Sequence, residues 1–202
     1  YVFWCGKSVW PLIQRLAKTT LFMPGNHDAT NVFQLIAEVL GNQKLAALSG
    51  LGQKRNYQAL LQSLSNTTFC GYSHHAFDIN GLAFDIIAGR PFSMGGPNLS
   101  FKPHLRKAFA VESLSASTEL IKQQVDQSQN KNVLFFAHNG PSGLGNKRDD
   151  IWGCDFKKTE GDFGDPDLEE AISYARSQGK NVMAVIAGHM HQHLKGGGER
   201  TW

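Results

Sequence analysis

Three short apolar segments of this chain each end directly in a polar turn that contains glycine, and this repetition constrains the fold more than any other feature. The segments are 19–23, 133–136 and 182–187. Short apolar runs bounded by turn residues are typical of buried β-strands. When strands alternate with helices, they form a sheet whose strand ends meet at a common edge. We therefore expect an α/β fold in which three loops, far apart in sequence, converge.

Helical patterns separate these strands. Apolar residues recur at helical spacing, or capping residues delimit a helix, over 32–40, 57–64, 113–128 and 165–179. Further short strands are expected at Tyr1–Cys5, at Phe69–Tyr72, and at 76–79 and 82–88, and a helix is expected at Pro11–Lys18. Asn80-Gly81, between the last two strands, is a favoured two-residue hairpin turn. The pattern predicts one α/β domain over 1–202.

Composition narrows the classes of partner. The net charge is +3 and the basic residues are scattered, so we expect no nucleic-acid partner. No apolar run approaches the roughly 20 residues of a membrane span, so no membrane partner is expected either. The three cysteines have no CxxC spacing, which favours reduced thiols in a soluble cytoplasmic protein.

Side chains suited to metal binding follow all three strands. Asn26 follows the first, His138 the second, and His189 and His191 the third. Neutral imidazole and carboxamide oxygen together suit ions such as Zn, Fe and Mn. Two histidines that are two residues apart face opposite ways in an extended segment, so His189 and His191 could serve different ions. Two ions roughly 4 Å apart would clamp a phosphoryl group and generate a hydroxide nucleophile near neutral pH.

His27 and Asp28 share a loop with the first of these candidate ligands. His27 could point toward a leaving-group oxygen as general acid, while the Asp28 carboxylate fixes its tautomer and raises its basicity. A single loop histidine is usually a surface or hydrogen-bonded residue. On that ground four histidines are left outside the site: His74, His75, His104 and His193.

The order of these motifs resembles a known superfamily. Gly25-Asn26-His27-Asp28, a strand ending in a lone His138, and Gly188-His189-Met190-His191 are similar to the calcineurin-like metallophosphoesterases. Longer strings at 89–93, 138–145 and 161–167 are similar to a branch of that superfamily found in cyanobacteria and plastid-bearing eukaryotes. The resemblance extends over nearly the whole chain, and it adds the plastid stroma as a second expected location.

The resemblance implies a two-sheet α/β sandwich flanked by helices, which hydrolyses phosphate esters with two metal ions such as Mn, Fe or Zn. It assigns Asn26, His138 and His189 to one ion, His191 to the other, and protonation of the leaving group to His27. The superfamily also has an Asp-x-His and a Gly-Asp motif near its first two strands, and neither is intact here. Gly6 is followed by Lys7 where a bridging carboxylate is expected, and Tyr1 opens inside an apolar run, so we expect that upstream sequence is missing.

Two hypotheses of different class remain open. The first is a metal-dependent phosphoesterase, whose choice among monoesters, nucleotide diesters and phosphoproteins lies in loops such as 41–56 and 89–107. The second is a catalytically silent relative that keeps a partial metal site and works as a binding module. Lys7 favours the second hypothesis, because a cation repels a metal ion.

Other polar residues near these motifs have structural explanations. Asp162, Asp165 and Asp167 could form an oxygen-rich Ca site, but turn formation and helix capping account for them better. The glycines of 89–96 and 140–145 are compatible with a phosphate cradle and with ordinary turns. Arg90 is a candidate substrate contact.

Overall fold

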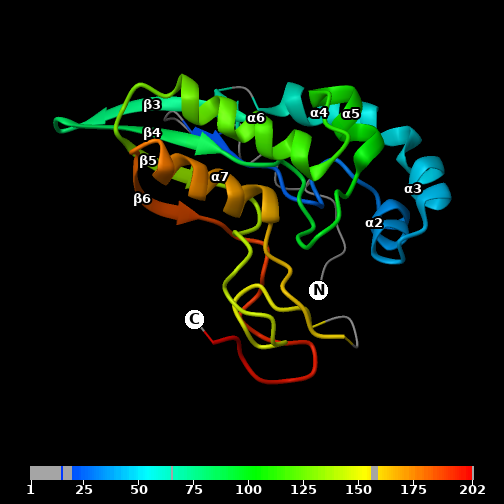
Figure 1. Cartoon of the computed structure of the whole chain (residues 1–202). Helices are drawn as coiled ribbons and strands as arrows, with labels where there is room; N and C mark the ends of the chain where they lie inside the picture. The colour runs from blue at the N-terminus through cyan, green and yellow to red at the C-terminus, as the bar shows by residue number, and fades with distance from the viewer. Residues whose placement is uncertain (1–14, 16–19, 65, 156–158, 202) are drawn as a thin grey trace.

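Figure 1 shows the computed structural model of the chain, in which residues 15, 20–64, 66–155 and 159–201 are described. Helices alternate with strands, and the strands form one sheet of two strands and one of four. The predicted mixed α/β class is therefore confirmed. The strand predicted at Tyr1–Cys5, the residue Lys7 and, apart from Arg15, the helix predicted at Pro11–Lys18 lie outside the described residues.

The smaller sheet pairs β1 (Thr20–Phe22) with β2 (Thr67–Phe69) in parallel. β1 falls within the strand predicted at 19–23. The strand predicted at Phe69–Tyr72 is wrong, because β2 ends at Phe69 and Tyr72 has a left-handed backbone with φ of 51°. A left-handed residue cannot continue an extended strand. The chain turns there into the larger sheet.

A group of helices connects β1 to β2: α2 (Val32–Val39), α3 (Gln43–Ser49), the short 3-10 helix η2 (Gly50–Gly52) and α4 (Gln53–Ser63). The helices predicted at 32–40 and 57–64 are confirmed. The connecting loop predicted between them is wrong, since it folds into α3, η2 and the start of α4. The Asn42 side chain caps α3 by accepting a hydrogen bond of 3.1 Å from the Leu45 N–H, which starts a helix in a segment rich in Ala and Leu.

The larger sheet has the strand order β3-β4-β5-β6. β3 (Ser73–Ile79) and β4 (Leu82–Ala88) are antiparallel, and β5 (Asn132–Phe136) and β6 (Asn181–Ile186) continue the sheet in parallel. Asn80 and Gly81 have φ of 54° and 83°, as a hairpin turn with two left-handed residues requires. The predicted hairpin is therefore confirmed.

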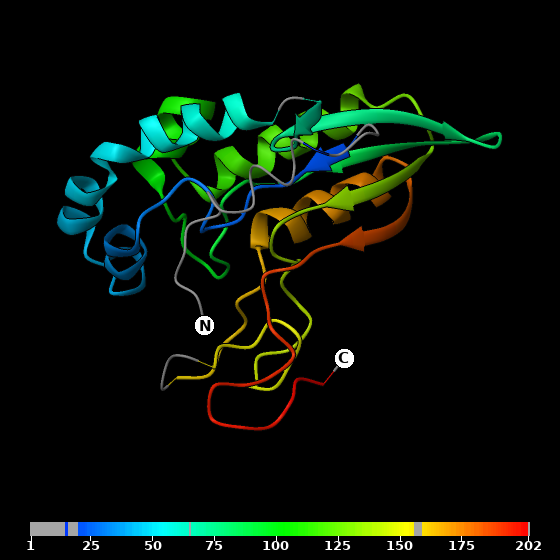
Figure 2. The same cartoon turned by 180° about the vertical axis from the view of Figure 1, so that it is seen from behind.

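Two helices cover one face of this sheet. α6 (Leu114–Gln127) and α7 (Pro166–Ser177) lie in front of the strands in Figure 1 and behind them in Figure 2. Both helices were predicted, and Ser113 caps α6 by accepting a hydrogen bond of 3.0 Å from the Ala116 N–H. A further helix, α5 (Lys102–Phe109), lies in a segment for which no helix was predicted.

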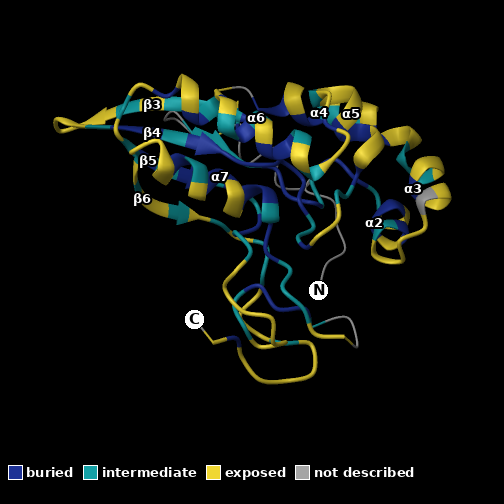
Figure 3. Cartoon of the chain, viewed as in Figure 1, coloured by how far each residue is buried: buried dark blue, intermediate teal, exposed yellow. Residues whose placement is uncertain are grey.

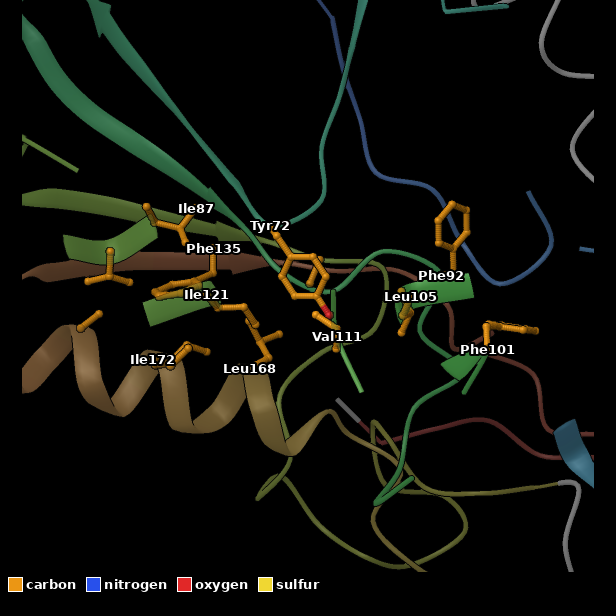
Figure 4. Packing of buried hydrophobic residues seen from close by; sticks show 14 of the residues in the cluster. Tyr72, Ile87, Phe92, Phe101, Leu105, Val111, Ile121, Phe135, Leu168 and Ile172 are labelled. Atoms are coloured by element: carbon orange, nitrogen blue, oxygen red, sulfur yellow. The ribbon is translucent and has the colours of Figure 1, made fainter. Parts of the chain in front are cut away.

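Part of the core lies between the sheet and these two helices, and residues coloured as buried in Figure 3 also occur in α2, α4 and α5. Val133 and Phe135 on β5 are fully buried, whereas Leu134 between them points to the other face and is half-buried. Ile121 of α6 and Leu168 of α7 belong to the same cluster, part of which is drawn in Figure 4. The sheet is thereby fixed against its helical layer, and the ends of β5 and β6 have defined positions.

Segments without helix or long strand, 137–155 and 159–165 after β5 and 187–201 after β6, form the lower part of the molecule in Figure 1. The buried Arg200 side chain ties them together by donating hydrogen bonds to the carbonyl oxygens of His191 (3.0 Å), Asp150 (2.8 Å) and Gly153 (2.8 Å). Among the described helices, none has the length and apolar character needed to cross a bilayer.

Candidate metal centre

The loop after β1 holds Asn26 in a buried position. The Asp28 carboxylate accepts a hydrogen bond of 2.7 Å from the Gly25 N–H, and the Asp28 N–H donates to the Gly25 carbonyl at 3.1 Å. The Thr30 hydroxyl donates to the Asn26 carbonyl at 2.6 Å. Together these bonds close a compact turn. Asp28 therefore shapes the loop, and its role as orienting partner of His27 stays a prediction.

His138 and His189 follow the neighbouring parallel strands β5 and β6. Pairing continues past both strands, because the Ala137 N–H donates to the Ile186 carbonyl at 3.0 Å and the Gly188 N–H to the His138 carbonyl at 3.0 Å. His189 has φ of 69°, a left-handed conformation that is uncommon outside glycine and costs on the order of 1 kcal/mol. Such backbone outliers concentrate at functional sites.

Three side-chain atoms from separate parts of the chain meet at these loops. Nε2 of His138 lies 3.1 Å from Oδ1 of Asn26 and 3.0 Å from Nδ1 of His189. One proton on the His138 Nε2 could serve only one of these two neighbours, whereas a metal ion can be bound by all three atoms. Asn26, His138 and His189 are called the three-donor cluster below.

The spacing within the three-donor cluster fits one metal ion. Nitrogen and oxygen ligands lie about 2.1 Å from such ions, so adjacent ligands are about 3.0 Å apart in an octahedral shell and about 3.4 Å apart around tetrahedral zinc. The contacts of 3.0 Å and 3.1 Å made by His138 match the octahedral spacing. Two imidazoles and a carboxamide oxygen form a mixed shell suited to Zn, Mn or Fe. The residues present therefore fit one such ion.

Burial holds both histidines of the cluster in the neutral form that binds metals. Burial, together with smaller effects of the nearby His189 and His27, lowers the pKa of His138 to about 3. Burial, together with smaller effects of His27 and His191, lowers the pKa of His189 to about 4. A hydrogen bond to the Met94 backbone partly opposes this shift and helps to fix the His189 ring. At neutral pH both rings therefore have lone pairs available for binding.

His27 and His191, the other predicted site histidines, lie close enough to affect one another electrostatically. Burial lowers the pKa of His27, and His191 lowers it further. His27 in turn lowers the pKa values of both cluster histidines. His27 and His191 thus lie within electrostatic range of one another and of the three-donor cluster, and their places in a metal site stay predictions.

The second predicted ion has less support. His191 is exposed, and nowhere in the described part of the chain do three or more His, Cys, Asp or Glu side chains group in a way that could hold a metal. The three-donor cluster contains only two such side chains, because its third member is an asparagine. The Lys7 position falls outside the described ranges. The described residues therefore supply donors for one ion, and the second ion stays a prediction.

A buried polar network supports the loops around the cluster. The Arg90 guanidinium is almost fully buried and pairs with Asp165 at 2.7 Å and with Asp167 at 3.0 Å. The Ser93 hydroxyl donates to Asp165 at 2.7 Å, and the Asn139 amide donates to it at 3.2 Å. Asn139 follows His138 directly, so the network connects the His138 loop to the glycine-rich loop and to the start of α7.

This network corrects two expectations. Arg90 cannot be a substrate contact, because its side chain is buried and paired with two carboxylates. Asp165 lies at the N-cap position of α7, but its side chain makes no capping hydrogen bond. Its carboxylate instead accepts hydrogen bonds from Arg90, Ser93 and Asn139. Sequence reasoning missed the network, and the only available signal was the Gly-Arg-Pro-Phe-Ser string resembling the superfamily branch.

Asp162 has the structural role predicted for it. Its carboxylate accepts hydrogen bonds from the Gly143 N–H at 2.6 Å and the Gly164 N–H at 2.7 Å. Both are turn contacts, which confirms turn formation as its role. Gly140 lies against a large side chain, since a β-carbon there would come 2.0 Å from Cζ2 of Trp152. Packing against Trp152 therefore accounts for the glycine at position 140.

Comparisons of the chain with protein families, with curated proteins and with solved structures found no match. The three-donor cluster is therefore interpreted from its own geometry and chemistry. Its support is the meeting of three donor atoms that are up to 163 residues apart in sequence, from position 26 to position 189.

Proposed function

We propose that this chain is a metal-dependent hydrolase of phosphate esters, built as a calcineurin-like two-sheet sandwich. The observation that carries the proposal is the three-donor cluster, in which His138 lies 3.0 Å from His189 and 3.1 Å from Asn26. Zn, Mn or Fe are the ions that suit these donors. When bound, such an ion polarises a phosphoryl oxygen and makes water a stronger nucleophile.

The residues of the chain have separate tasks in this proposal. Asn26, His138 and His189 hold one ion, and His191 contributes to a second. His27 binds near the leaving group and donates a proton to its oxygen as the ester bond breaks. Asp28 keeps the loop of His27 in shape through its hydrogen bond to Gly25. The choice between monoester and diester substrates is left to the surrounding loops.

A metal-binding protein without turnover is the second candidate. The exposure of His191 favours it, because the described donors account for one ion only. Both candidates require the three-donor cluster to bind metal, and only the first requires hydrolysis.

The decisive experiment measures metal binding and turnover on the same purified chain. Titration with Mn²⁺ and Zn²⁺ by calorimetry gives the affinity, and release of nitrophenol from nitrophenyl phosphate and bis(nitrophenyl) phosphate gives the activity. We expect binding and metal-dependent hydrolysis, and loss of both in His138→Ala. The matched control is His193→Ala, which removes an exposed histidine that was placed outside the site.

The outcomes separate the candidates. Metal binding that depends on His138 without release of nitrophenol would favour the binding protein. Metal affinity that is equal in the parent and in His138→Ala would overturn both candidates, because the cluster would then not be the metal site.

A further inference from the structure

Helix α2 has apolar side chains on its exposed side, although apolar Leu35 and Ala37 are already buried on the other side. Its buried residues include the polar Gln34, whose amide contacts the Gln53 side chain at 2.5 Å. Its exposed positions include five apolar side chains, namely Val32, Phe33, Ile36, Val39 and Leu40. These positions follow the three- and four-residue spacing of one helical stripe. A stripe of this kind in contact with water indicates a surface that another phase or molecule covers.

The next two elements extend this apolar surface. Leu45 and Leu48 of α3 and Leu51 of η2 are also exposed, and Leu51 has an exposed fraction of 82%. α3 packs beside α2, because the Asn31 amide that begins α2 donates to the Ser49 carbonyl at the end of α3 at 2.7 Å. Both helices protrude from the body of the molecule in Figures 1 and 2. The eight exposed side chains are called the α2–α3 apolar face.

The segment 31–64, which contains this face, has more basic than acidic residues. Between 31 and 64 the chain has three basic residues, Lys44, Lys54 and Arg55, and all three are exposed. The one acidic residue in that range, Glu38, accepts a hydrogen bond of 2.9 Å from the Phe101 N–H and is therefore occupied. Lys54 and Arg55 follow Gln53, which contacts α2. Segment 31–64 thus combines exposed apolar side chains with a net positive charge.

We propose that the α2–α3 apolar face docks on the surface of an anionic lipid bilayer. Short helices with Phe, Leu and Ile on one side and cations beside them insert their apolar side chains at the boundary of headgroups and acyl chains. Anionic headgroups then attract the lysines and the arginine. No spanning segment is required, so the proposal replaces the expectation of no membrane partner, which considered spanning runs alone.

Other occupants suit the face less well. A second copy of the chain that docked through the same segment would bring three further cations toward these three, and Glu38 is the one carboxylate that segment 31–64 offers to pair with them. Protein interfaces are enriched in Tyr, Trp and Arg at their centres. The exposed apolar side chains here are aliphatic except for Phe33. A surface of this composition is typical of helices that insert among acyl chains.

The test is flotation of the full chain with vesicles, in low and high salt. Vesicles of phosphatidylcholine alone are compared with vesicles that also contain phosphatidylserine. We expect binding to the anionic vesicles, weaker binding in high salt, and roughly 30-fold weaker binding in Lys54→Gln/Arg55→Gln, since each of the two cations near the surface contributes about fivefold. Phe33→Ser/Leu51→Ser should abolish flotation.

A control variant removes two other exposed apolar side chains, far from α2 and α3 in the sequence. Ile79→Ser/Leu82→Ser changes the tip of the β3–β4 hairpin, where both residues are exposed, and should leave flotation unchanged. His138→Ala should also float normally, which keeps this test independent of the proposed hydrolase activity.

Two results would overturn the proposal. One is flotation that is absent with both kinds of vesicle, or that persists in Phe33→Ser/Leu51→Ser. The other is a dimer, seen by light scattering, that Phe33→Ser/Leu51→Ser converts to a monomer. The second result would assign the face to another copy of the chain.

Discussion

Gly25 lies so close to His138 that no side chain fits between them: a β-carbon on Gly25 would come 2.4 Å from Cε1 of the His138 ring. Real β-carbons do not approach other heavy atoms so closely. The loop after β1 and the end of β5 therefore meet at this glycine, and the position of His138 depends on its missing side chain. The effect reaches Asn26, the next residue, whose Oδ1 lies 3.1 Å from His138 Nε2.

Gly25→Ala should weaken metal binding while leaving most of the fold intact. The new methyl group forces the His138 ring away from Asn26 and His189, and displaced ligands typically cost roughly 10- to 100-fold in metal affinity. Calorimetric titration with Zn²⁺ measures this loss. Gly52→Ala is the control, because a β-carbon at Gly52 meets no heavy atom within 4 Å. Equal affinities of the two variants would contradict the proposed dependence.

Arg90→Met should destabilise the protein strongly. It leaves the Asp165 and Asp167 carboxylates buried without their cation, and removing one partner of a buried ion pair costs about 3–5 kcal/mol in the free energy of unfolding. Urea denaturation measures the change. Arg106→Met is the control, because Arg106 is exposed and lies 3.9 Å from Glu112, so its loss should cost less than about 1 kcal/mol.

The same network should show coupling. Arg90→Met combined with Asp167→Asn removes a cation and a carboxylate together, so the double variant should be less destabilised than the sum of the two single variants. Purely additive effects would show that Arg90 and Asp167 do not depend on one another.

Acid should destabilise the fold partly through His104. The His104 ring is buried against Tyr57 and Phe92, with ring centroids 4.9 Å and 5.2 Å away, and burial lowers its pKa from 6.5 to about 4. Below pH 6.5 His104 binds a proton in the unfolded chain, whereas in the folded chain it stays neutral until the pH approaches 4. The stability contributed by neutral His104 is therefore complete above pH 6.5 and is lost as the pH falls toward 4, by about 3 kcal/mol in total.

His104→Phe isolates this contribution from that of the cluster histidines, whose pKa values are also lowered. The variant should lose less stability than the parent between pH 6.5 and pH 4, as measured by urea denaturation at each pH. Parallel pH profiles of parent and variant would exclude His104 as a source of acid sensitivity.

Local sequence signals predicted much of the fold. Asn80-Gly81 specifies its hairpin through two left-handed residues, and Ser113 specifies the start of α6 through one hydrogen bond. Each signal acts within a few residues, so a sequence pattern contains it. The segment containing α3 was misjudged because its flanking glycines, Gly41 and Gly52, suggested a loop while the Asn42 cap between them favours a helix.

The candidate site could be predicted only in part, for a related reason. The ends of neighbouring parallel strands lie side by side whatever their spacing in sequence, which is why the meeting of His138 and His189 after β5 and β6 was foreseeable. Asn26 follows β1, which belongs to the smaller sheet, so its approach to His138 does not follow from a shared sheet edge. The pairing of Arg90 with Asp165, 75 residues apart, follows from burial in one packed structure. Neither hydrophobic periodicity nor a short motif indicates that two residues so far apart will pair. The close contact between Gly25 and His138 could not be predicted for the same reason.

His27→Ala should slow hydrolysis according to the leaving group, if the proposed general acid is correct. A poor leaving group such as an alkoxide needs its proton during bond cleavage, whereas nitrophenolate departs without one. General acid catalysis contributes roughly 10²- to 10⁴-fold, so the variant should lose about that factor on an alkyl phosphate and much less on nitrophenyl phosphate.

Zn²⁺ affinity, measured in parallel, should stay close to that of the parent because His27 is not in the three-donor cluster. His193→Ala should leave both rates unchanged, since His193 is exposed and contacts Glu199 outside the site. An equal loss on both substrates in His27→Ala would instead assign His27 to holding the phosphoryl group or the metal.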